Sequence, residues 1–86
     1  MRSNHMPEVA GDVATVTGSL VLDLDAMGVR ECQSYSVALA ATPVAGASIA
    51  TGKLSDDKKK LTLEVWTSAF GVSATATKVA WSAIGR

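Results

Sequence analysis

The sequence contains few side chains that carry reactive chemistry. Its 86 residues include one cysteine and one histidine. A single cysteine cannot form an internal disulfide, so the fold does not depend on oxidising conditions. Glu31 and Gln33 flank Cys32 and provide no cation that would activate its thiol. We therefore expect Cys32 to be a small, partly buried hydrophobic residue at the start of a strand.

Groupings of residues for metal binding or catalysis are also missing. One histidine and one cysteine are too few ligands for a metal site. Asp23 and Asp25 lie on one strand face, but calcium requires about six to eight oxygens, and two aspartates at a strand end are typical of turn capping. His5 lies in a segment without periodicity, where nothing would hold it as a general base. These absences predict a protein that is not an enzyme and uses no cofactor.

Charge and hydropathy favour neither nucleic acid nor a membrane as the partner. Eight basic residues balance eight acidic residues, and the isoelectric point is about 6.5. The basic run at 58–60 directly follows Asp56 and Asp57, which is typical of a solvated turn and not of a nucleic-acid patch. No apolar run approaches the roughly 18 residues of a membrane span, and the N-terminus lacks the apolar stretch of a signal peptide.

The sequence is instead rich in apolar residues that recur at every second position. Such alternation places successive side chains on opposite faces of a strand. It predicts strands at 13–25, with a break near Gly18 and Ser19, and at 33–41, 61–68 and 78–84, with a weaker strand at 47–51. A short helical turn fits only within 23–29. We therefore expect an all-β fold, a small antiparallel β-sandwich or jelly-roll-like domain of about five to seven short strands. The repeating residues are Leu20, Leu22, Leu24; Tyr35, Val37, Leu39; Leu61, Leu63, Val65; and Val79, Trp81, Ala83.

The expected organisation is an N-terminal arm at 1–12 followed by a single β domain at 13–86. The arm has no periodicity, and we consider both a flexible tail and a segment that becomes ordered on a neighbouring subunit. Fourteen of the apolar residues are alanine, which leaves few large side chains for a core. Because small cores give little net stability, we expect this domain to assemble with further copies of itself.

The two tryptophans are the best candidates for contacts with a partner. Trp81 shares a strand face with Val79 and Ala83, which predicts a position in the core or in a subunit interface. The face of Trp66 also carries Thr62 and Glu64, and a tryptophan on a polar face is the better candidate for touching a partner. The candidate interface residues are Pro7, Val9, Trp66 and Trp81.

Three stretches resemble a class of small virion proteins of tailed phages. They are VTGSLVLDLDAMGVRECQSYSVALAATPVAG at 16–46, KLTLEVWTSA at 60–69 and ATATKVAWSAIGR at 74–86. The resemblance consists of a "GxRE" segment after the first strand, an "xVW" strand end and a closing alternation that ends in glycine. The matching positions are Gly28, Arg30, Glu31; Val65, Trp66; and Thr77, Val79, Trp81, Ala83, Gly85.

This resemblance implies a structural role in the virion, as a capsid decoration or cement protein, a head fibre or a tail-associated module. We expect a capsid decoration protein that binds other virion proteins, the major capsid protein above all, through symmetric and arm-mediated contacts. It would form a homo-oligomer, with a trimer favoured, and be located in virions assembled in the cytoplasm of a bacterial host. The alternative is a glycan- or receptor-binding module of a tail fibre or adhesin, in which an exposed Trp66 would stack on a sugar.

Overall fold

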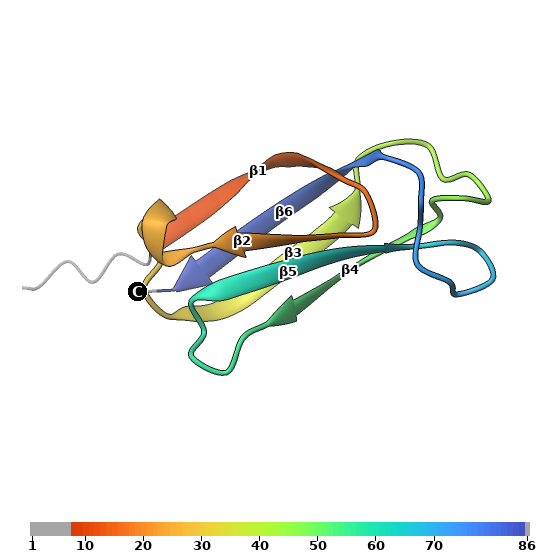
Figure 1. Cartoon of the computed structure of the whole chain (residues 1–86). Helices are drawn as coiled ribbons and strands as arrows, with labels where there is room; N and C mark the ends of the chain where they lie inside the picture. The colour runs from red at the N-terminus through yellow and green to blue at the C-terminus, as the bar shows by residue number, and fades with distance from the viewer. Residues whose placement is uncertain (1–7, 86) are drawn as a thin grey trace, which may run out of the picture.

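The strands form two antiparallel sheets that face each other as a small β-sandwich (Figure 1). The structure is a computed structural model that describes residues 8–85. Sheet A has the strand order β1-β6-β3, and sheet B has the order β2-β5-β4. The all-β sandwich predicted from the sequence is therefore confirmed. The elements are β1 (Glu8–Val16), β2 (Ser19–Asp23), the 3₁₀ turn η1 (Asp25–Met27), β3 (Cys32–Leu39), β4 (Ile49–Leu54), β5 (Lys60–Trp66) and β6 (Thr77–Gly85).

The core lies between the central strands of the two sheets, β5 and β6. Every second residue of each central strand is buried, as the alternation predicts. Cys32 is buried at the start of β3, as expected, and η1 is the short helical turn expected within 23–29. Over residues 8–85, no helix has the length and hydropathy to cross a membrane. The core cluster comprises Val16, Leu22, Leu24, Val29, Cys32, Ala47, Leu61, Leu63, Val65, Val79, Trp81 and Ala83.

The chain passes from sheet A to sheet B at Gly18, where the sequence predicts a break. Gly18 has a φ of 78°, a backbone conformation that favours glycine. Its carbonyl accepts a hydrogen bond from the Val65 amide at 2.8 Å. A Cβ at this position would also lie 3.2 Å from Val72 Cγ1. The hydrogen bond from Val65 therefore attaches the turn between β1 and β2 to sheet B.

The predicted boundary between an arm at 1–12 and a domain that starts at residue 13 is wrong for residues 8–12. These residues form the first part of β1 and pair with β6, from Glu8 opposite Gly85 to Asp12 opposite Trp81. Their sequence carries no apolar alternation because the inward positions are Ala10 and Asp12. These residues form a strand because they pair with β6, which is distant in the sequence, and the periodicity of a short segment does not reveal such a partner. The rest of the predicted arm, including Pro7, lies outside the described residues.

β4 begins at Ile49 and ends at Leu54, both later than the predicted 47–51, and its second half continues through Gly52. An added Cβ at Gly52 would lie 2.7 Å from Val37 Cγ2 and 2.9 Å from Tyr35 Cε1. The Tyr35 hydroxyl donates a hydrogen bond to the Gly52 carbonyl at 3.1 Å. Glycine at this position therefore allows the edge strand β3 of sheet A to approach the edge strand β4 of sheet B.

A charged turn at 55–59 joins β4 to β5 and overlaps the 56–60 stretch that the sequence predicts to be a solvated turn. The Asp57 carboxylate accepts hydrogen bonds from the Ser55 hydroxyl at 2.6 Å and from the Lys59 amide at 3.1 Å. The Ser55 bond, and to a lesser extent the Lys59 bond, holds the pKa of Asp57 below its ordinary value of 3.8. Asp57 thus has a structural role within its own turn.

The core position of Leu63 predicts a large loss of stability on truncation. Leu63→Ala removes a fully buried side chain and should lower the free energy of unfolding by about 2–5 kcal/mol. Val21→Ala is the matched control, because Val21 lies on the outer face of the same sheet and is 58% exposed. It should change stability by less than about 0.5 kcal/mol. Urea unfolding measures both, and equal losses would contradict this placement of the core.

Ser55→Ala should raise the pKa of Asp57 towards 3.8, because it removes the strongest of the two hydrogen bonds to the carboxylate. A depressed folded-state pKa adds stability above the unfolded-state pKa, and this stability is lost as the pH falls through the folded-state pKa. The lowered pKa of Asp57 should therefore make wild type more stable than the variant at neutral pH. This part of the difference should vanish in acid. Carboxyl-carbon NMR titration of Asp57 measures the shift, and an unchanged pKa would contradict it.

Candidate binding surfaces

The outer face of sheet B carries a row of side chains that we call the Trp66 surface. These residues alternate with the buried Leu61, Leu63 and Val65 and therefore point away from the core. The register places Ile49 opposite Trp66 and Lys53 opposite Thr62. The Trp66 surface consists of Ile49, Thr51 and Lys53 from β4, Thr62, Glu64 and Trp66 from β5, and Phe70 from the turn that follows.

One end of the Trp66 surface is aromatic and apolar. Ile49, Thr51, Trp66 and Phe70 line a shallow hollow of about 350 Å³. The Trp66 indole Nε1–H donates a hydrogen bond to Thr51 Oγ1 at 2.8 Å across the two strands. The single polar atom of this indole is therefore already satisfied, and the ring is held in a defined orientation beside the hollow.

Phe70 is held in an unusual backbone conformation at the edge of this hollow. Its φ is 65°, in a region that bulky residues rarely adopt, and its side chain is 76% exposed. The turn around it is closed by hydrogen bonds from the Phe70 amide to the Thr67 carbonyl at 3.0 Å and from the Gly71 amide to Thr67 Oγ1 at 3.0 Å. The turn therefore positions an exposed ring that does not take part in the core.

Neighbouring loops support this end of the sandwich. The Ser48 amide donates to the Trp66 carbonyl at 2.9 Å, and the Ser68 amide donates to the Ala45 carbonyl at 2.9 Å. The buried Ser73 hydroxyl donates to the Gly46 carbonyl at 2.6 Å. The loop before β4 and the loop after β5 are thus joined by hydrogen bonds, which stabilise the position of the Trp66 surface.

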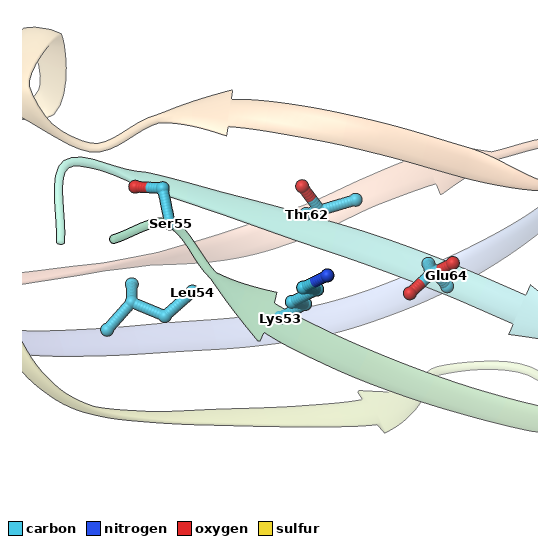
Figure 2. Close-up of a pocket in the computed structure, with 5 residues that line it drawn as sticks. All are labelled: Lys53, Leu54, Ser55, Thr62 and Glu64. Atoms are coloured by element: carbon cyan, nitrogen blue, oxygen red, sulfur yellow. The ribbon is translucent and has the colours of Figure 1, made fainter. Parts of the chain in front are cut away.

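The other end of the Trp66 surface is polar (Figure 2). Lys53, Leu54, Ser55, Thr62 and Glu64 line a hollow of about 320 Å³. Lys53 and Thr62 come from neighbouring strands, and Glu64 lies further along β5 (Figure 2). Within residues 8–85, the side chains of Lys53, Thr62 and Glu64 form no hydrogen bond or ion pair. A donor, an acceptor and a hydroxyl are therefore available to a ligand at this end.

The outer face of sheet A has a different character, and we call it the sheet A face. It consists mainly of small side chains, and among its residues only Lys78, at one end, is charged. Val13 stands above these small residues and is 51% exposed, and Val9 and Ile84 are also exposed. The sheet A face comprises Val9, Gly11, Val13 and Thr15 from β1, Lys78, Ala80, Ser82 and Ile84 from β6, and Ser34, Ser36 and Ala38 from β3.

The structure separates the candidate interface residues predicted from the sequence. Val9 lies exposed on the sheet A face, and Trp66 lies on the opposite side of the sandwich. Trp81 is 6% exposed and lies in the core. Its alternation predicts either the core or a subunit interface, and within this chain it occupies the core. Its interface role stays a prediction, as does that of Pro7, which lies outside the described residues.

Two contributors to these surfaces have no clear signal in the sequence. Val13 is one of several valines near the N-terminus, and its exposure depends on the pairing of β1 with β6. Phe70 is a single aromatic residue in a turn, and a positive φ at a phenylalanine has no sequence signature. The Asp23 carboxylate accepts a long hydrogen bond from the Ala26 amide at 3.4 Å, but the N-cap position of η1 is Leu24, which has no side-chain cap bond.

Two of the segments that carry the resemblance to virion proteins, the "GxRE" segment and the closing glycine, meet at one end of sheet A. Gly28 has a φ of 94° and ends the η1 turn. Gly85 packs directly on the Glu31 carbonyl, and an added Cβ would clash with that backbone. The "GxRE" segment and the closing glycine thus contact each other, and both have structural roles in this fold.

The chain is thus a small β-sandwich with two outer faces of different side-chain composition. Comparison with protein-family models, with curated proteins and with solved structures finds no match for this chain.

The hydrogen bond between Trp66 and Thr51 can be tested with an isosteric change. Thr51→Val removes the acceptor of the indole N–H and should cost about 1 kcal/mol of stability. It should also shift the indole proton resonance of Trp66 upfield, while that of Trp81 stays in place. Thr62→Val is the control, because the Thr62 hydroxyl has no partner within residues 8–85. An unchanged Trp66 resonance in Thr51→Val would contradict the contact.

Proposed function

We propose that this chain is a non-enzymatic structural protein of a tailed-phage virion, a capsid decoration protein that binds the major capsid protein. The sheet A face supports this proposal most directly. It exposes Val9, Val13 and Ile84 above a flat layer of small residues. Exposed apolar patches mark protein interaction sites, and the centres of protein interfaces are depleted in charge. A partner protein can therefore cover this face without burying an unpaired charge at its centre.

The partner covers the flat face and does not extend sheet A as an additional strand. β1 is an edge strand, and an unpaired edge invites strand addition. Asp12 lies on this edge, and its carboxylate accepts a hydrogen bond from the Val13 amide at 2.7 Å. An exposed carboxylate that occupies a backbone donor at the edge opposes the pairing of another strand.

The chemistry-bearing side chains fit a structural role better than catalysis. The Cys32 thiol is buried and donates to the Ser34 carbonyl at 3.2 Å. The Asp57 carboxylate is engaged by its own turn, and the Asp23 carboxylate accepts a long hydrogen bond from the Ala26 amide. These groups have local structural partners, and they lie in different parts of the sandwich.

Assembly on a symmetric lattice supplies stability that the small core lacks. A partner that binds only the folded chain stabilises it by mass action, so burial of the sheet A face stabilises the whole domain. We expect a closed homo-oligomer, with a trimer favoured, or attachment at equivalent sites of the capsid. The predicted arm contributes through residues 1–7, since residues 8–12 belong to β1.

Val13→Glu should abolish attachment to virions while the chain remains folded. Burial of an unpaired carboxylate costs several kcal/mol, so we expect binding to weaken by more than about tenfold. Val21→Glu is the matched control, because Val21 is 58% exposed on the opposite outer face. Co-sedimentation with capsids of the phage that encodes the chain measures binding, and light scattering measures the oligomeric mass. Equal binding of both variants, or absence of the wild-type chain from purified virions, would contradict the proposal.

A further inference from the structure

We propose that the Trp66 surface is a saccharide-binding site that takes an oligosaccharide of pyranose rings. The site lies on the outer face of sheet B, on the opposite side of the sandwich from the sheet A face. It therefore goes beyond attachment to the virion and remains free when the sheet A face is covered.

The aromatic end provides the stacking platform. Trp66 is fixed by its hydrogen bond to Thr51 at 2.8 Å, so its ring needs no reordering when a ligand binds. Because the indole N–H is already satisfied, the ring offers its apolar surface to a ligand and not its donor. The apolar C–H face of a pyranose ring is complementary to an aromatic surface of this kind.

Phe70 forms the exposed side of the same hollow. A turn with positive φ is most easily made by glycine, and Gly71 is the next residue in the chain. The chain instead holds a phenylalanine in the strained conformation, with its ring 76% exposed. Strained residues of this kind cluster at binding sites, and the ring has no role in the core that would account for the strain.

The polar end supplies the hydrogen bonds. A sugar hydroxyl both donates and accepts, so it requires both kinds of partner. Glu64 accepts, Lys53 donates and Thr62 does either, and within the described chain none of these side chains is engaged. Thr62, Glu64 and Trp66 follow one another at every second position of β5, over about 13 Å. The two hollows share no lining residue, but they lie one after the other along the same face of β5.

A saccharide fits the Trp66 surface better than a protein surface does. A protein that covered it would have to bury Lys53 and Glu64, and an unpaired charge removed from water is costly. The same charges in a saccharide site remain hydrated at the rim and bond to hydroxyl groups. The combination of an aromatic platform with unengaged polar side chains therefore favours a polyhydroxylated ligand.

The test is an NMR titration of the ¹⁵N-labelled full-length chain. The probes are maltohexaose, cellohexaose, chitohexaose, mannohexaose and a set of purified bacterial O-polysaccharides. We expect at least one probe to produce saturable shifts at the Trp66 indole N–H and at the amides of Phe70 and Gly71. The indole N–H of Trp81, in the core, is the internal reference and should not move.

Two variants and one control assign the binding to this surface. Phe70→Ala removes the exposed ring and Glu64→Ala removes the acceptor, and each should weaken binding of that probe by about tenfold. Both side chains lie outside the core, so the fold should be retained, and the amide spectrum verifies this. Val13→Ala, on the sheet A face, should bind within about twofold of wild type.

Three results would overturn the proposal. The first is that no probe binds saturably, and the second is that the shifts lie on the sheet A face. The third is a dimer, detected by sedimentation, that dissociates in Phe70→Ala, since the surface would then bind a second copy of the chain. None of these results affects the attachment to virions that Val13→Glu tests, so the two proposals can fail independently.

Discussion

The structure depends on the burial of one face of each central strand, β5 and β6, against the other. Leu61, Leu63 and Val65 are the fully buried side chains of β5, and Trp81 is the largest buried side chain of β6. The flanking strands are held to these two by backbone pairing. Because a strand has two faces, burial of the inner residues determines which residues remain outside. The two outer faces and their different chemistry are therefore consequences of the core.

β1 contributes one fully buried valine to the core, Val16, and leaves its other two valines exposed. Its other inward positions include Ala10, Ala14 and the exposed Asp12. Its outward positions include Val9 and Val13, which remain exposed. Two of the three valines of β1 thus lie on the side that the proposed partner would cover. A partner bound there would bury apolar surface that the isolated domain leaves exposed, and binding to the folded chain alone stabilises it.

The two tryptophans show how position within a strand decides the role of a residue. Trp81 lies in phase with the inner residues of β6 and fills the core, where its indole nitrogen has no partner among residues 8–85. Trp66 lies out of phase with the inner residues of β5 and points outwards, where Thr51 accepts its N–H. A shift of one residue in either strand would exchange these environments. Alternation in the sequence was sufficient to distinguish these two environments.

The sequence by itself determined the all-β class, the positions of β3, β5 and β6 to within a few residues, the break at Gly18 and the burial of Cys32. These features depend on periodicity and on turn residues, which are local properties of the chain. Only the tertiary structure decided that residues 8–12 join β1, that β4 continues through Gly52, and that Phe70 stands exposed beside Trp66. Pairing with β6, contact with Tyr35 and closure of the turn by Thr67 produce these features. Each of them brings together residues that no short window of sequence contains, or a backbone conformation that side-chain pattern does not encode.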